Sequence, residues 1–254
     1  MANIKFMWQS LEDATLTATS TDSGFPLTNL QNRNPALVWK SDVDTATQYL
    51  NIDFGSSRSC DTCIVDGTNF GDISATYIVL QYSSDAAFTS PTQAGSFSVS
   101  SSSAEKLEFT AASFRYWRIK FFDTIPFGIY PKIGNIFLGT RVEMTQPYDT
   151  GIEKSSGFST SQTRAIDGTR YTSQLYNGLK KYKIKFTNIN ETDKTSINTL
   201  FEGIRGSYFP FYFVDADSTI VLVYSVNDEN PLQTKAYQIY DTAEVNLEAY
   251  SVNT

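Results

Sequence analysis

Few side chains of this protein could carry out catalysis, because its 254 residues include no histidine. Without histidine, neither a Ser-His-Asp nor a Cys-His arrangement can activate a nucleophile. Asp215 and Asp217 could act as paired carboxylates, but they follow a strand pattern and precede Ser218-Thr219, so we predict a turn there. The glycines are isolated and form no phosphate-binding loop. We therefore predict no catalytic residue, no cofactor and no enzymatic activity.

Cys60 and Cys63 have the C-x-x-C spacing that serves zinc binding or thiol redox chemistry. A structural zinc site would need two more ligands, and the chain has no other cysteine and no histidine. A redox motif needs an exposed helix start, whereas this pair lies between Phe54-Gly55 and Ile64-Val65, in a predicted pair of strands. We predict two small, partly buried residues and no metal site.

The charge and composition argue against a nucleic-acid-binding groove. The formal net charge is −7, and such a groove needs clustered lysine and arginine. The nearest cluster, residues 180–185, has the pattern of a strand with its lysines on the solvent face. Charged residues make up only 19% of the chain, so Ser, Thr, Asn and Gln must supply much of the polar surface. That composition suits strands and turns better than surface helices.

No targeting or membrane segment is predicted. The opening residues 1–5 are not followed by the apolar run of a signal peptide. No stretch approaches the ~20 apolar residues of a membrane span. We expect a soluble protein that is made in a cytoplasm and does not insert into a membrane.

We expect strands to position most of these side chains, because polar and apolar residues alternate with a period of two over residues 39–140. Polar and apolar residues alternate within 49–54, 77–82 and 115–121, which indicates half-buried strands. Short clusters of Gly, Asp, Asn and Ser separate them, as in a β-sandwich. Residues 1–35 are polar and irregular, and we expect an extended lead-in there.

The character of the chain changes near residue 140. Residues 145–151 are rich in turn formers, so we predict one domain over 1–143 and a second over 144–254. Two hairpin signals follow, Asp167-Gly168 and Asn177-Gly178, since both dipeptides suit the left-handed positions of a tight turn.

Residues 191–205 carry the one persuasive helix pattern. Asn190 is the predicted N-cap, with Glu191 and Asp193 in the first turn and Gly206 just past the end. The apolar stripe of this helix consists of Ile197, Leu200, Phe201 and Ile204. Strands are expected on either side of the helix, including one with Phe209, Phe211 and Phe213 on a single face.

A series of short landmarks over 39–139 resembles the discoidin, or galactose-binding-like, jelly-roll domain. In chain order they are Trp39-Lys40-Ser41-Asp42, Leu50-Asn51-Ile52-Asp53-Phe54-Gly55, Asp66-Gly67-Thr68-Asn69-Phe70, Tyr82-Ser83-Ser84-Asp85, Arg115-Tyr116-Trp117-Arg118-Ile119 and Ile133-Gly134-Asn135-Ile136-Phe137-Leu138-Gly139. The resemblance covers about residues 25–140. It implies a β-sandwich that binds surfaces, sugars or other proteins.

Residues 150–250 resemble the tail-tube-like domain of phage distal-tail and baseplate-hub proteins. The shared pattern is a strand, a helix, and a phenylalanine-rich strand that ends in Asp. Its parts here are Lys181-Tyr182-Lys183-Ile184-Lys185-Phe186, Thr195-Ser196-Ile197-Asn198-Thr199-Leu200-Phe201 and Phe209-Pro210-Phe211-Tyr212-Phe213-Val214-Asp215. Together the two resemblances imply a mainly β chain. A discoidin-like β-sandwich would be followed by a tail-tube-like β-barrel or sandwich with one α-helix.

The phage resemblance implies a structural protein of the virion. It would be a distal-tail or tail-tip ring subunit, a homohexamer, that joins the tail tube to tip, hub or receptor-binding proteins. It would be made in the host cytoplasm, and DNA would only pass through the ring. The residues we expect at the ring interface lie near the hairpin turns: Arg164, Arg170, Tyr171, Leu175 and Tyr176.

The discoidin resemblance implies an alternative, a non-catalytic carbohydrate-binding module of a surface or adhesion protein, with a host glycan as partner. Trp39 and Trp117 could stack on a sugar, but the resemblance implies that both are buried. It also suggests a structural calcium ion near Asp42, Asp44 and Asp66. Calcium needs six to eight oxygen ligands, so these three acids alone do not predict a site.

Overall fold

The structure of the chain is a computed structural model. It describes residues 3–43, 47–73, 78–97, 104–121, 128–145, 152–236, 239–242 and 244–250; within them, the side chains at 158–160, 174–178, 234 and 236 are not described. The chain forms two compact units. Met7–Arg141 is here called the sandwich unit, and Met1–Phe6 with Val142–Thr254 is called the terminal unit. The described residues are mostly β-strand with one α-helix, which confirms the predicted mainly β fold.

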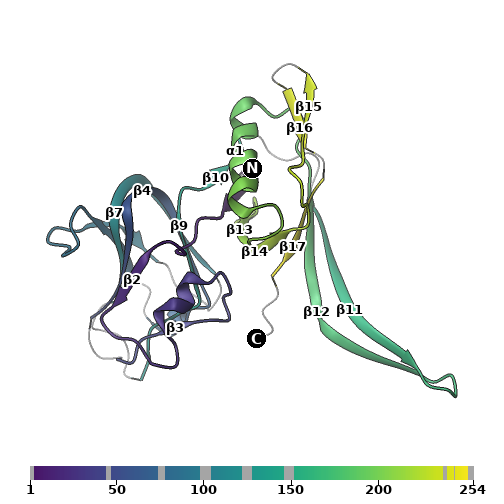
Figure 1. Cartoon of the computed structure of the whole chain (residues 1–254), viewed down its shortest axis with the longest axis horizontal. Helices are drawn as coiled ribbons and strands as arrows, with labels where there is room; N and C mark the ends of the chain where they lie inside the picture. Colours follow the sequence, from purple (N-terminus) through teal and green to yellow (C-terminus); the bar gives the residue numbers. More distant parts are fainter. Residues whose placement is uncertain are drawn as a thin grey trace. The chain divides into compact units, whose positions relative to one another are not determined.

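The sandwich unit is built on two long, curved strands, β4 (Gln48–Asp66) and β7 (Glu105–Phe121) (Figure 1). Its sheet has the order β2-β4-β7-β5-β6, with β9 also paired to β4, and β3 pairs separately with β8. The other elements are β2 (Thr15–Ala18), η1 (Leu27–Gln31), β3 (Trp39–Lys40), η2 (Phe70–Asp72), β5 (Ile78–Ser83), β6 (Thr92–Ser96), β8 (Lys132–Ile133) and β9 (Asn135–Gly139).

A bend in β4 lets this strand serve two parts of the sandwich. The pairing with β7 is irregular between Asp53 and Arg58, where Gly55 has a φ of 72°. Before the bend β4 pairs with β2, and after it β4 pairs with β9. The alternating residues of the strands bury their apolar side chains in one core, which includes Trp39 and Trp117. The predicted period of two and the buried tryptophans are therefore confirmed.

The terminal unit contains a seven-stranded sheet of order β10-β1-β13-β14-β17-β12-β11 and a separate pair, β15-β16. The described strands leave this sheet open, with β10 and β11 at its edges, so it is not the closed barrel that was one expected form. Its elements are β1 (Lys5–Met7), β10 (Val142–Glu143), β11 (Glu153–Arg164), β12 (Arg170–Ile184), α1 (Glu191–Ile204), β13 (Phe211–Val214), β14 (Ile220–Ser225), β15 (Leu232–Ala236), β16 (Ile239–Thr242) and β17 (Val245–Ala249).

The first residues differ from the expected polar, irregular lead-in. Ile4, Phe6 and Met7 are almost completely buried, and β1 lies between β10 and β13 in the sheet of the terminal unit. The Phe6 ring is 6.0 Å from Phe211 and 5.8 Å from Phe213. A strand of three residues is too short to show an alternating pattern, and its partners are far away in the sequence.

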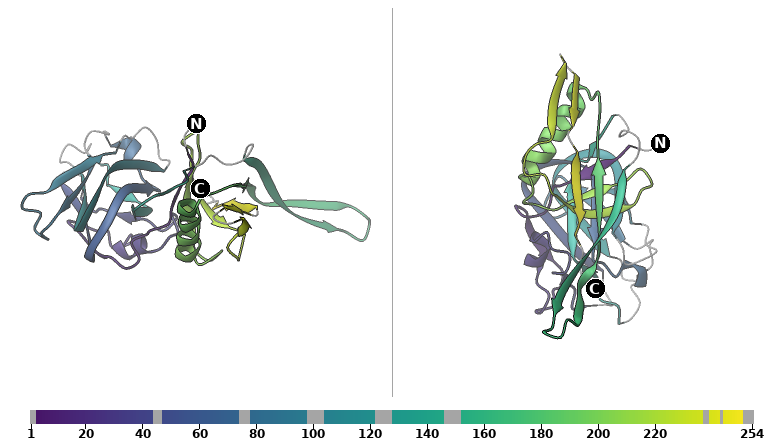
Figure 2. Two further views of the ribbon diagram at one scale, coloured as in Figure 1. Left: turned by 90° about the horizontal axis from the view of Figure 1, so that it is seen from above. Right: turned by 90° about the vertical axis from the view of Figure 1, so that its right-hand side faces the viewer.

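Helix α1 begins and ends as predicted. The side chain of Asn190 accepts a hydrogen bond from the backbone N–H of Asp193 at 2.9 Å, and Gly206 follows the helix with a φ of 68°. The four stripe residues are buried. Figures 1 and 2 show α1 beside the part of the sheet that contains β13 and β14. Phe211 and Phe213 are buried in that part of the sheet.

One of the two predicted hairpins is confirmed and the other is wrong. Asp167-Gly168 forms the turn between β11 and β12, with a φ of 87° at Gly168. Asn177-Gly178 instead lies inside β12, where the register with β11 shifts between Gly157 and Ser159. The dipeptide thus accompanies a bulge, because β11 is long enough to keep pairing beyond it.

No helix among the described residues is long and apolar enough to cross a membrane.

Candidate functional site

A long two-stranded ribbon extends from the sheet of the terminal unit (Figures 1 and 2). Strand β12 pairs with β17 only through Lys181–Ile184, whereas β11 and β12 pair with each other as far as Arg164 and Arg170. Beyond the sheet, these two strands have only each other as backbone partners among the described residues. Residues 157–179 are called the arm from here on.

Side chains of the outer arm are exposed. All residues over 161–173 are exposed except the half-buried Ala165. They include two large apolar side chains, Ile166, which is fully exposed at the turn, and Tyr171, which is 61% exposed. A two-stranded hairpin is marginally stable on its own in water. Among the described residues, the outer arm is therefore held only by the pairing of its own two strands.

The tip of the arm is cationic. Arg164 and Arg170 lie directly opposite each other in the last pair of the ladder, where like charges repel. Among the residues that the structure describes, no carboxylate pairs with either guanidinium. Asp167 instead accepts a hydrogen bond from the backbone N–H of Thr169 at 2.9 Å, and this bond lowers the pKa of the Asp167 carboxyl.

The residues predicted for a ring interface all belong to the arm. Arg164, Arg170 and Tyr171 lie at its tip with exposed side chains. Leu175 and Tyr176 are part of β12, and Tyr176 lies opposite Ser159, but their side chains are outside the described residues. No described contact shows what any of these residues binds.

The base of the arm is fixed by an ion pair. The Lys154 ammonium lies 2.6 Å from Asp215 Oδ2 and 3.5 Å from Asp217 Oδ2, and the hydrogen bond to Asp215 raises the Lys154 pKa. Asp215 and Asp217 form the β13–β14 turn, as predicted, since Asp217 accepts from the Thr219 N–H. A cavity of about 270 Å³ is lined by Lys154 of this ion pair, by Thr219 of the turn and by Tyr182, among others. These carboxylates therefore hold a turn and the arm base together.

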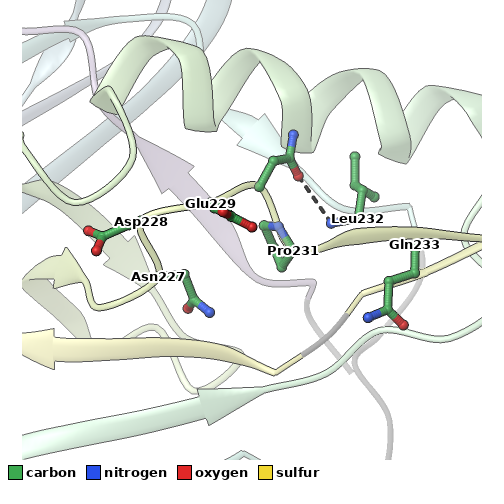
Figure 3. A pocket seen from close by; sticks show the side chains of 7 residues that line it. Asn227, Asp228, Glu229, Pro231, Leu232 and Gln233 are labelled. Carbon is green, nitrogen blue, oxygen red and sulfur yellow. Dashed lines mark hydrogen bonds between the residues drawn. The ribbon is translucent and has the colours of Figure 1, made fainter.

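A second surface of the terminal unit is an acidic loop that sequence analysis did not identify. Residues 227–233 line an open depression of about 600 Å³ (Figure 3). Asp228 and Glu229 are exposed there. The loop is held by Asn230, which accepts from the Leu232 N–H and donates to Asn198 Oδ1 at 2.6 Å. Its turn-forming residues are visible in the sequence, but its exposure and shape are not.

In the sandwich unit, the structure describes all of the candidate metal and redox residues except Asp44. Cys60 and Cys63 are free and buried, and desolvation raises the pKa of Cys60 to about 12. Asp42 is exposed, Asp66 uses Oδ1 to accept from the Gly67 N–H, and Asp44 lies outside the described residues. Among the described residues, no three or more His, Cys, Asp or Glu side chains are grouped so that they could hold a metal ion.

One aromatic and cationic cluster lies on the surface of the sandwich unit. The Lys40 ammonium is 4.9 Å from the ring centroid of Tyr130 and 5.7 Å from that of Phe25. The Phe25 side chain is 39% exposed, and Tyr130 is half-buried. An exposed ring beside an ammonium can stack on an apolar ring face and attract an anion.

No protein-family model matches the chain, and no curated protein matches it. Solved structures similar to about half of it include carbohydrate-binding modules. Chitosan-binding module 1 of a chitosanase/glucanase from Paenibacillus sp. IK-5 is 19% identical, with a TM-score of 0.44 over 51% of this chain and 98% of that one. A CBM32 module from Clostridium perfringens, in complex with GalNAc-β-1,3-galactose, is 14% identical, with a TM-score of 0.43 over 52% and 99% of the two chains.

A third similar structure is the CBM32 module of AlyQ in complex with 4,5-unsaturated mannuronic acid. It is 24% identical, with a TM-score of 0.41 over 52% of this chain and 96% of that one. Nothing in these comparisons shows a phage tail protein. At TM-scores below 0.5, the similarities also carry no argument about what this chain binds.

Proposed function

We propose that this protein is a non-catalytic structural subunit that joins copies of itself through the arm. The observation that carries the proposal is the two-stranded arm, whose residues 161–173 are almost all exposed and include a cationic tip and two large apolar side chains. A ring subunit at the tip of a phage tail is the assembly that best fits the sequence resemblance of residues 150–250. In it, the terminal unit would form the ring, and the sandwich unit would bind neighbouring tip proteins.

Edge pairing gives this assembly a physical basis. Strand β11 lies at an edge of the seven-stranded sheet and leaves one row of backbone donors and acceptors without a strand partner among the described residues. Such an edge promotes pairing with another chain. A head-to-tail contact that closes after a fixed number of copies covers every edge and stops growth. A homohexamer is the ring order that the resemblance favours.

Deletion of residues 158–176 tests the role of the arm. Gly157 lies opposite Leu179, so the deletion would join them through Asn177-Gly178, which suits a two-residue hairpin turn. We expect rings with a central opening in negative-stain images of the full chain and only single particles for the deletion variant. Rings from both proteins would refute the role of the arm, and single particles from both would refute self-assembly.

The Phe25 and Lys40 cluster favours a second candidate function, glycan binding by the sandwich unit. The exposed ring would stack on a sugar, and the ammonium would attract a carboxylate, which suits an acidic glycan. We expect mannuronate oligomers, as acidic glycans, to bind the full chain and to lose affinity for Phe25→Ala but not for the control Leu37→Ala, whose apolar side chain is equally exposed. Equal binding to both variants, or none to the wild type, would reject this function.

A further inference from the structure

The arm tip and the acidic loop of the terminal unit have complementary chemistry. The tip carries Arg164 and Arg170, whereas the loop carries the exposed carboxylates of Asp228 and Glu229. We infer that the arm tip of one copy docks on the acidic loop of the next copy. This inference rests on the proposed self-assembly and names the two surfaces that meet.

The tip is built as a small anchor. In its turn, Ala165 donates its N–H to the Thr169 carbonyl and accepts from the Gly168 N–H, while the Asp167 carboxylate accepts from the Thr169 N–H. This fixed turn exposes the whole Ile166 side chain. Arginine is enriched among the residues that dominate interface energies, and an ordered turn lowers the entropy cost of binding.

The loop offers both an acidic and an apolar surface. The Ser207 hydroxyl hydrogen-bonds to the Asp228 carboxylate, which ties the segment after α1 to the loop. Tyr208, the next residue, is 68% exposed, and Val226, which precedes the loop, is 56% exposed. The depression of about 600 Å³ lies along this loop and is also lined by Leu232 (Figure 3). An isoleucine with flanking arginines matches this combination of apolar and acidic groups.

The contact would be head to tail, because the tip and the loop are different surfaces of the same unit. A head-to-tail contact repeats from copy to copy and closes into a ring when the rotation allows it. Complementary charges at the contact attract the correct surface, whereas like charges repel an incorrect one. The two opposed arginines of the tip would then be neutralised by the neighbouring copy.

Charge reversal on each surface gives a sharp test. The tip variant is Arg164→Glu with Arg170→Glu, and the loop variant is Asp228→Lys with Glu229→Lys. Each places like charges at every contact, so self-association should weaken by about tenfold or more in sedimentation velocity. The control variant is Lys180→Glu with Lys185→Glu, which replaces two exposed lysines. It changes the net charge as much as the tip variant does, and it should associate like the wild type.

An equal mixture of the tip and loop variants tests whether the tip of one copy contacts the loop of the next. In alternating order, the Glu tip of one variant meets the Lys loop of the other, while the Arg tip of the second meets the unchanged acidic loop of the first. We therefore expect the mixture to recover assemblies of wild-type mass that contain both chains. Because Asp228 also contacts Ser207, Glu229→Lys alone serves as a milder loop variant with a smaller loss of association.

The outcomes separate this inference from the proposed function. If the wild type assembles and loses assembly on deletion of 158–176, but the loop variants associate normally, then the arm joins copies at another surface and the docking inference is overturned. Failure of the mixture to recover assembly also overturns it. A wild type that stays monomeric at all concentrations overturns both.

Discussion

The ammonium of Lys154 lies 2.6 Å from Oδ2 of Asp215, although their strands are far apart in the order of the sheet. Lys154 is on β11, and Asp215 follows β13, with β14, β17 and β12 between the two strands. The sheet must therefore curl so that its two sides approach each other. The rings of Tyr182 and Phe213, 5.5 Å apart, cross the same gap. The arm thus leaves the sheet from a base that side chains hold in place.

Replacing Lys154 should loosen this base. In Lys154→Met, Asp215 would keep only local hydrogen bonds such as that from the Ala216 N–H, so we expect unfolding to become easier by about 1 kcal/mol in urea titrations. Lys180→Met, a matched change of an exposed lysine lining the same cavity, should change stability by less than ~0.5 kcal/mol. Equal effects of the two substitutions would show that the ion pair does not hold the base.

The contribution of this ion pair to folding stability should depend on pH in a defined direction. The pKa of Lys154 lies above its usual value of 10.5 because of the hydrogen bond to Asp215. Because the lysine pKa is raised on folding, the ion pair contributes its full stability below pH 10.5. This contribution is lost as the pH rises through the pKa of Lys154 in the folded protein. The stability difference between wild type and Lys154→Met should therefore shrink above pH 10.5 and stay constant around neutral pH.

Removing the cap of α1 should destabilise the terminal unit. Asn190 accepts from the Asp193 N–H at 2.9 Å and donates to the Thr145 hydroxyl at 3.1 Å. We expect Asn190→Ala to lower the free energy of unfolding by about 1 kcal/mol, whereas Asn190→Ser should keep most of the capping. Circular dichroism during urea unfolding measures both. An alanine variant as stable as the serine variant would contradict the role of the cap.

The two cysteines should be inert in the folded protein. Burial raises the pKa of Cys60 to about 12 and also raises the pKa of the Cys63 thiol, so very little thiolate exists at pH 8. We expect a thiol-specific reagent to label both only at the rate of unfolding and to label them at once in denaturant. Fast labelling of the native protein would show that β4 opens locally or that the site is accessible.

A substitution at Gly134 should damage the sandwich unit. Gly134 donates its N–H to the Asp66 carbonyl, and a Cβ atom there would overlap the carbonyl oxygen of Pro35. We expect Gly134→Ala to cost about 1–3 kcal/mol of stability. At Gly24 an added Cβ would make only ordinary contacts, so Gly24→Ala is the control and should unfold like the wild type. Similar stability of both variants would mean that the backbone at Gly134 can shift without cost.

Local signals predicted much of the fold. The alternating segments became strands because each has one buried face, and α1 followed from its cap, its apolar stripe and its final glycine. The Asp167-Gly168 turn followed from the backbone freedom of that dipeptide. Each of these features depends on residues close together in the chain.

Non-local features could not be predicted. Residues Ile4 and Phe6 give no periodic signal, and their burial depends on pairing of β1 with strands more than a hundred residues away. The Asn177-Gly178 signal failed because continued pairing of β11 and β12 outweighed the local preference for a turn. The acidic loop and the exposed tip residue Ile166 became candidates only once burial was known.

Self-assembly through the arm is most directly tested by the molar mass of the full chain and of the 158–176 deletion variant, measured by light scattering over a wide range of concentration. We expect a defined oligomer for the full chain, a hexamer in the favoured form. We expect a monomer for the deletion variant with the same thermal stability, since the outer arm is exposed. An oligomer that survives the deletion, or a full chain that remains monomeric throughout, would contradict it.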